Sequence, residues 1–272
     1  MVKIKIIICI KQVPGTTEIR INPETNTLIR EGVETVINPF DTYAIEEGIR
    51  LKERLCQGQE IKEEIEVIAI TMGPHQSESI LREAISLGAD KAILLSDRAF
   101  AGADTWATAL TLQNAIKKIE DWRLIILGKQ TLDGDTGQVG PELAQMMHIP
   151  FIGYASSIVE INRNKITVKR LMEDRYETIE VRLPAAISVG KDINIPRVPS
   201  LRGKLKAKNE QIPVWGKNEL ALEDENIGLS GSYTQVIKIF TPRHHYEVKM
   251  LEGTPDEQVD ELYNKFKELN IL

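Results

Sequence analysis

A glycine-rich stretch between residues 128 and 140 contains the residue types that most strongly indicate a bound ligand. The apolar run Leu124–Leu127 precedes it, and Pro141 and Glu142 follow it as they would in the first turn of a helix. A strand, a glycine-rich loop and a helix start together direct backbone N–H groups and the positive end of a helix dipole toward an anion such as a phosphate. Glycines let the backbone approach a ligand that a side chain would displace. The stretch therefore predicts a phosphate-binding loop, although an ordinary strand-to-helix connection would show the same pattern.

Beyond this loop, the sequence shows no combination of residues typical of covalent or metal-dependent catalysis. The loop matches neither the G-x-G-x-x-G pattern nor the Walker pattern, so the motif alone does not identify its ligand. The histidines, His75, His148, His244 and His245, lie apart or in surface-type segments, and the adjacent pair would need further ligands to hold a metal. We therefore expect a binding site with no catalytic side chains and no metal.

Composition and charge indicate a globular protein that does not bind nucleic acid. The 272 residues are 42% hydrophobic and 27% charged, and the net charge is −6, whereas nucleic-acid-binding domains are usually basic. The apolar run Ile6–Ile10 ends at Lys11 and is too short for a signal peptide or a membrane span. The two cysteines, Cys9 and Cys56, provide no disulfide framework. These features predict a cytoplasmic protein without a membrane span.

Buried strands alternate with amphipathic helices through the first half of the chain, which predicts an α/β fold of the Rossmann type. Such alternation gives βαβ units and a parallel sheet with helices on both faces. The expected strands are Lys3–Ile10, Glu66–Thr71, Lys91–Leu95 and Leu124–Leu127. The expected helices begin at or near Asp41, Ser77, Asp104 and Val139, with Asp41 and Ser77 as caps and Gly88 as a stop. A hairpin is expected between Ile19–Asn22 and Thr27–Arg30.

The segments that follow the strands should meet at one edge of this sheet. In parallel α/β sheets, ligands bind at the carboxyl ends of the strands. Four segments occupy such positions: Cys9–Val13, Met72–Pro74, Ser96–Thr105 and Gly128–Gly140. Asn38–Asp41 starts a helix and is expected to join them. We therefore predict a single crevice lined by these five segments.

The second half of the chain has a different pattern. Alternating apolar and polar residues predict a small antiparallel meander from about residue 157, and Ala185–Val189 returns as a buried strand. Residues 191–272 lose this periodicity and form an expected C-terminal arm, distinct from an α/β domain at residues 1–190. The arm ends in an amphipathic helix that begins at Thr254 and carries Val259, Leu262, Phe266 and Leu269 on one face. We expect this face to pack on a partner subunit.

Six blocks of residues, in their order and spacing, resemble the β (small) subunit of electron transfer flavoproteins over essentially the whole chain. The blocks are Ile10–Pro14, Asn38–Asp41, Thr71–Pro74, Leu87–Asp90, the loop at 128–140 and Ser200–Lys208. Each block alone is weak evidence, whereas the set is specific. The resemblance implies a heterodimer whose α subunit carries a redox-active FAD. It also implies a nucleotide in the β subunit, which is a structural AMP or, in the electron-bifurcating branch, a second FAD.

Two segments are similar to the bifurcating branch in particular. The loop Asp133–Pro141 is shorter and less bulky than the loop of the AMP branch, and Ser96–Thr105 also has the bifurcating form. Gly137 stands where alanine is expected, a small departure that leaves the class unchanged. This form implies that NADH passes a hydride to FAD in this chain. One electron then goes to ferredoxin or flavodoxin and the other to the α-subunit FAD, which feeds an acyl-CoA or related dehydrogenase.

The resemblance assigns residues to two surfaces. The cofactor-binding residues that it implies are Cys9, Lys11, Asn38, Asp41, Met72, Thr105, Gly128, Lys129, Gln130, Thr131, Leu132, Asp133, Gly134, Asp135, Thr136, Gly137, Gln138, Val139 and Gly140. It also implies a loop that docks on the dehydrogenase and carries Leu201, Arg202, Lys204, Leu205, Lys206 and Lys208. Judged without the resemblance, these basic residues would form an ordinary solvated face.

Two other functions fit the same sequence. One is a non-bifurcating electron carrier with structural AMP. The other, from a different class, is a stand-alone adenine-nucleotide-binding module of similar architecture. The long segment from Gly190 to Leu272 argues against the stand-alone module, because a self-contained domain has little use for it.

Overall fold

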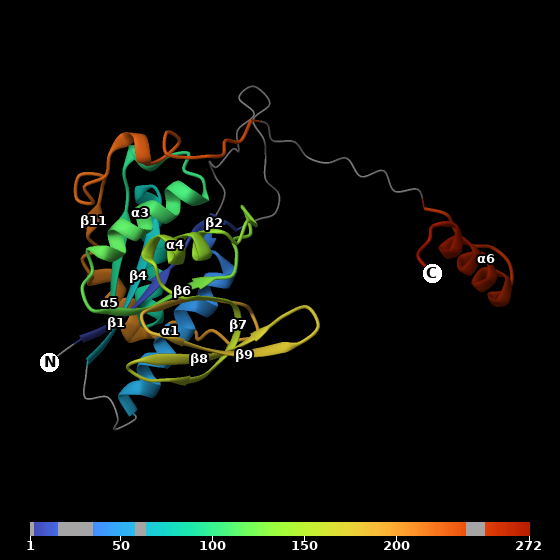
Figure 1. The fold of residues 1–272 in the computed structure, drawn as a ribbon, viewed down its shortest axis with the longest axis horizontal. Helices are drawn as coiled ribbons and strands as arrows, with labels where there is room; N and C mark the ends of the chain where they lie inside the picture. Colours follow the sequence, from blue (N-terminus) through green and yellow to red (C-terminus); the bar gives the residue numbers. More distant parts are fainter. Residues whose placement is uncertain (1–2, 16–34, 58–63, 238–247) are drawn as a thin grey trace.

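The computed structural model describes residues 3–15, 35–57, 64–237 and 248–272 (Figure 1). Most of its strands form one sheet: β1 (Lys3–Cys9), β4 (Glu64–Met72), β5 (Lys91–Leu95), β6 (Trp122–Gly128), β7 (Phe151–Ile161), β8 (Lys165–Leu171), β9 (Tyr176–Arg182), β10 (Ala185–Val189) and β11 (Val214–Trp215). A second, small sheet pairs β2 (Gln12–Pro14) with β3 (Thr35–Ile37). The helices are α1 (Pro39–Gln57), α2 (Glu78–Leu87), α3 (Thr105–Lys117), α4 (Val139–Met147), α5 (Leu201–Asn209) and α6 (Pro255–Glu268). Short 3-10 turns are η1 (His75–Ser77), η2 (Arg98–Phe100) and η3 (Asp224–Asn226).

The large sheet has nine strands in the order β11-β5-β4-β1-β6-β10-β7-β8-β9. The strands from β11 to β7 pair in parallel, and only the β7-β8 and β8-β9 pairs are antiparallel. β1 lies at the centre, where Ile7 pairs with Ile68 of β4 and with Ile125 of β6. A central strand needs apolar residues wherever both of its faces are covered, which explains the buried isoleucines at positions 6, 7 and 8 of β1.

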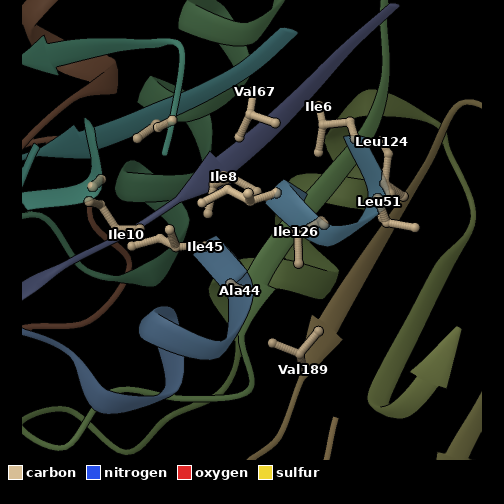
Figure 2. Packing of buried hydrophobic residues seen from close by; sticks show 14 of the residues in the cluster. Ile6, Ile8, Ile10, Ala44, Ile45, Leu51, Val67, Leu124, Ile126 and Val189 are labelled. Carbon is tan, nitrogen blue, oxygen red and sulfur yellow. The ribbon is translucent and has the colours of Figure 1, made fainter. Parts of the chain in front are cut away.

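Helices cover both faces of the sheet and enclose two hydrophobic cores. Ile6 and Ile8 point into the core formed with α1 and α2, shown in Figure 2. Ile7 and Cys9, one residue out of phase, point into the core formed with α3 and α4. Alternation of side chains along a strand thus divides β1 between the two layers. The result is a doubly wound α/β body, as the sequence predicted.

Several local expectations are confirmed and others need correction. The strands Lys91–Leu95 and Ala185–Val189 match β5 and β10 residue for residue, and Gly88 ends α2 with φ +135°. Ser77 forms no side-chain cap for α2. The expected antiparallel meander is formed by β7, β8 and β9, and it extends the main sheet because β7 also pairs in parallel with β10. The hairpin expected at 19–30 lies outside the described residues.

The expected arm, residues 191–272, has two parts with different packing. α5 lies on α2, β11 pairs with β5, and Leu220 and Ile227 are buried in the core beside α3. In contrast α6, the red helix in Figure 1, has no buried residue, although its capping box at Thr254 and Glu257 forms as expected. None of the helices in the described ranges is apolar over enough residues to cross a membrane.

Candidate nucleotide site

The switch point of the sheet lies between β1 and β6. From β1, the chain continues to β4 and β5 on one side, whereas β6 and β10 lie on the other. In doubly wound sheets, the crevice at the carboxyl ends of the two strands flanking this point is where ligands bind. Here, Lys11 follows β1 and Gly128 ends β6. The candidate site is therefore built around these two chain ends.

Asp41 joins the two sides of the switch point. Its carboxylate Oδ2 accepts a hydrogen bond from the backbone N–H of Lys11 (2.7 Å), and its Oδ1 accepts one from the N–H of Gly128 (3.1 Å). Asp41 was expected to cap its own helix, but it lies in the first turn of α1, only 4% exposed, and its carboxylate bonds to the two neighbouring loops instead. This side chain thus links the two loops at the floor of the candidate site.

Burial changes the proton affinity of two side chains at this floor. Burial raises the pKa of Asp41 to about 7, although the hydrogen bonds from Lys11, Asn38 and Gly128 act in the opposite direction. Burial, assisted by the charge of Asp41, raises the pKa of the Cys9 thiol to about 12. A thiol that stays protonated is a poor nucleophile and metal ligand. Since the Cys9 side chain points into the core, only its backbone is placed to meet a ligand.

The raised pKa of Asp41 predicts a pH-dependent stability that Asp41→Asn should remove. Between the ordinary value of 3.8 and about 7, the folded chain binds the proton more tightly than the unfolded chain, so stability falls as pH rises. Between about pH 5.5 and about pH 8, the wild type should lose roughly 2 kcal/mol relative to Asp41→Asn. Urea unfolding of both proteins at the two pH values measures this difference. Parallel curves would show that Asp41 keeps its ordinary pKa in the fold.

Asn38 holds the glycine-rich loop in place. Its Nδ2 donates to the carbonyl of Gln130 (2.9 Å), and its Oδ1 accepts from the N–H of Leu132 (3.3 Å). Asn38 is fully buried, and its own backbone N–H donates to the carbonyl of Lys11. Through its side chain and its backbone, this one residue therefore connects α1, the end of β1 and the loop, which leaves the outer part of the loop free to face a ligand.

The charges near the loop are largely paired. The Lys11 ammonium contacts both carboxylate oxygens of Asp133, at 2.7 and 2.8 Å. Against an opposing effect of burial, this ammonium holds the pKa of Asp133 below its ordinary value. The Lys129 ammonium lies 4.9 Å from the centre of the Phe40 ring. The loop thus offers an anion mainly backbone N–H groups rather than a cluster of free cations.

The loop passes into α4 without a side-chain cap. Gln138 is the N-cap residue and makes no side-chain capping bond, so the first N–H groups of α4 are not satisfied by a cap. Gly137, with φ +62°, makes the turn into the helix in a conformation that favours glycine. The Thr105 hydroxyl donates to Glu142 Oε1 (3.1 Å), which connects the start of α3 to the first turn of α4.

Gly140 lies at a packing contact between α4 and β7 that the sequence did not indicate. It is buried, and a Cβ there would lie 3.0 Å from the ring of Phe151. Its missing side chain therefore lets α4 pack closely on β7, and we expect a substitution to act through packing rather than by blocking a ligand.

The structure brings most of the predicted site residues together. Asn38 and Asp41 bond directly to Lys11, Gly128, Gln130 and Leu132, and Thr105 approaches Gln138 at 3.5 Å. Met72 ends β4 and packs, half-buried, on the core beside α3 and α4. Glu142 was not among the predicted site residues. The sequence did give one signal for Glu142: its place in the first turn of a helix that follows a glycine-rich loop.

The predicted docking residues lie on a helix rather than on a loop. Ser200 caps α5, and its hydroxyl accepts from the N–H of Gly203 (3.0 Å). Leu201 and Leu205 project outward, 77% and 56% exposed. Arg202, Lys204, Lys206 and Lys208 are also exposed, although the Lys206 ammonium bonds to the carbonyls of Ala89 and Asp90.

Comparison with known proteins gives a consistent result. The family model described as the electron transfer flavoprotein domain matches residues 25–220. The subunit CarD of the caffeyl-CoA reductase-Etf complex from Acetobacterium woodii is 42% identical over 269 residues, covering 98% of this chain and 100% of CarD. The electron transfer flavoprotein subunit beta of Thermoanaerobacterium thermosaccharolyticum is 42% identical over 268 residues, covering 98% of this chain and 99% of that protein. FixA of Azotobacter vinelandii is 41% identical over 243 residues, or 87% of this chain and 84% of FixA.

Proposed function

The chain belongs to the electron transfer flavoprotein family as a β subunit, and from this premise we propose that the crevice between β1 and β6 binds FAD for electron bifurcation. The observation that supports this site best is the Asp41 carboxylate, which joins the ends of the two switch-point strands. The glycine-rich loop beside it is braced by Asn38 and leads into an uncapped helix start.

The residues present fit the diphosphate of a dinucleotide. A Cβ at Gly134 would lie 3.2 Å from Thr131 Oγ1 and 4.0 Å from Lys11 Nζ, so the absence of a side chain leaves space beside the ammonium. Backbone N–H groups in the loop and the positive end of α4 can face this space. Since Lys11 is already paired with Asp133, the neutral N–H groups provide most of the stabilisation of an added anion.

The chain's own residues bind and orient the cofactor. A bound flavin supplies hydride acceptance from NADH and single-electron transfer. Asp41 and Asn38 keep the loops at a fixed separation, and Thr105 and Glu142 connect α3 to α4 at the edge of the crevice. The Cys9 thiol, buried and protonated, stays out of the chemistry.

Bifurcation is the finer part of the proposal. It is supported by the similarity of the loop Asp133–Pro141 and of Ser96–Thr105 to the bifurcating branch. The two electrons of NADH would be divided between ferredoxin or flavodoxin and the FAD of an α subunit. That second FAD would deliver electrons to an acyl-CoA or related dehydrogenase, which docks on α5.

The count of nucleotides in the purified heterodimer tests this proposal. We expect two FAD per heterodimer after denaturation, and NADH-dependent ferredoxin reduction only when the high-potential acceptor is also present. The dependence on both acceptors distinguishes bifurcation from simple NADH oxidation. One FAD with one AMP, and no ferredoxin reduction, would instead identify a non-bifurcating carrier with structural AMP.

A further inference from the structure

The helix α5 has an inward and an outward face with different compositions. Leu201 and Leu205 lie on the outward face with Lys204. Gly203 and Ala207, four positions apart, lie toward α2, and Ala207 is buried. Lys206 is the exception among the basic residues, because its ammonium turns back to the protein body.

Gly203 lets the backbone of α5 rest on the backbone of α2. A Cβ at this position would lie 2.1 Å from the carbonyl oxygen of Ser86, in the last turn of α2. Real side chains do not tolerate such a distance, and the obstructing atom belongs to the backbone and cannot turn aside. α5 therefore packs on α2 with a close backbone contact at position 203, where only glycine fits.

Two long basic side chains, one from each helix, connect α5 to α2 and to the turn after α2. From α5, the Lys206 ammonium donates to the carbonyls of Ala89 (3.0 Å) and Asp90 (2.9 Å), in the turn after α2. From α2, the Arg82 guanidinium donates to the carbonyls of Ala207 and Glu210, at the end of α5. Arg82 thus satisfies carbonyl groups at the end of α5, where a positive charge also complements the helix dipole, and Lys206 satisfies carbonyl groups in the turn that follows α2.

The segment that leads into α5 is held as well. The Arg197 guanidinium contacts Glu46 (2.8 Å) and Glu53 (2.7 Å), both on α1. Burial acts to raise the pKa of Glu46, but its contacts with Arg197 and Arg50 prevail and hold the pKa below its ordinary value. The outward leucines therefore lie on a helix that packs on α2, and the segment before this helix is held on α1.

We propose that Lys206 is a positioning residue for docking: it holds α5 on the turn after α2 so that Leu201 and Leu205 face the partner, and it does not itself contact the partner. The proposal rests on the docking role of α5 in the proposed function. It distinguishes two of the basic residues of this helix: Lys206 acts within the chain, and Lys204 is free to meet an acidic partner surface.

Lys204 and Lys206 form a matched pair for the test, since both are lysines on the same helix. The protein is the full heterodimer, and the probe is an acyl-CoA dehydrogenase that the wild type reduces. Lys206→Met should raise the KM for this dehydrogenase about tenfold, because charge-assisted hydrogen bonds are lost, while kcat and flavin content stay unchanged. Hydrogen exchange at the α5 amides should speed up in Lys206→Met alone, and Lys206→Arg should restore both properties.

Lys204→Met should have the complementary effect. Its α5 amides should exchange as in the wild type, and its KM should depend less on salt, because a charge facing the partner has been removed. Leu201→Ala serves as the reference for docking. A raised KM in Leu201→Ala with an unchanged KM in Lys206→Met would overturn the positioning role alone, as would a reduced salt dependence in Lys206→Met. Unchanged KM values in both Leu201→Ala and Lys206→Met would reject docking through α5 and this proposal with it.

Discussion

Replacing Gly128 with alanine is expected to weaken nucleotide binding by roughly ten- to a hundredfold and to lower the free energy of unfolding by about 1–3 kcal/mol. A Cβ at this position would lie 2.3 Å from Asp41 Oδ1, 2.8 Å from the Cβ of Phe40 and 2.9 Å from the Phe40 carbonyl carbon. The added methyl group must displace the carboxylate that joins the two loops or move the start of α1. Either movement disturbs the floor of the candidate site.

Gly190 provides the matched control for this substitution. It follows β10, the strand next to β6, and a Cβ there would meet no atom within 4 Å. Gly190→Ala should therefore bind nucleotide and unfold as the wild type does. Nucleotide content after gel filtration and urea unfolding curves measure both effects. Equal nucleotide binding by the two variants would mean that the site is not built on the contact between Gly128 and Asp41.

The sequence predicts the layers of this fold well because burial imposes a simple pattern. A parallel strand must be apolar where both of its faces are covered, and residues 6–8 of β1, 92–95 of β5 and 185–187 of β10 have this composition. The capping box of α6 is equally local, since Thr254 and Glu257 satisfy each other's backbone N–H groups within a single turn. Features determined by neighbouring residues in the chain are therefore recovered without the structure.

Features determined by distant residues are not recovered in this way. Asp41 looks like a helix cap in the sequence because a cap and a cross-loop acceptor have the same residue type and the same place before a helix. Its partner Gly128 is 87 residues away along the chain. Gly140 likewise resembles a phosphate-binding glycine, whereas its neighbour in space is the ring of Phe151 on β7.

The predicted docking residues on α5 show the same limit at the scale of one helix. The resemblance treats Arg202, Lys204, Lys206 and Lys208 alike, as a basic surface. Only the position of the turn at Ala89 and Asp90 separates Lys206 from the others. A sequence pattern gives the charge of such a segment, but which charges face inward depends on the element on which the helix rests.

Removal of α6 is expected to abolish the heterodimer while leaving the α/β body folded. A chain that ends at Ile237 keeps β11, the buried Leu220 and Ile227, and the bonds from Thr234 to Asp104. It loses a helix with no buried residue, on which Val259, Leu262 and Leu269 are 65%, 42% and 57% exposed. A cut after Gly190 would be less informative, because α5 and β11 would be lost from the body itself.

The expected size of this effect follows from the apolar area that α6 offers a partner. Complete burial of Val259, Leu262, Phe266 and Leu269 would contribute about 1.5–3 kcal/mol each, so losing the whole face should weaken association by well over about a thousandfold. Within the full chain, Leu262→Asp should weaken association strongly, whereas Asn264→Asp, which adds the same charge on the opposite side of the helix, should have little effect. Each variant is coexpressed with the α subunit, and light scattering after size exclusion measures heterodimer formation by the chain ending at Ile237, by Leu262→Asp and by Asn264→Asp. If the chain ending at Ile237 still forms a heterodimer of wild-type affinity, the partner must instead bind the α/β body.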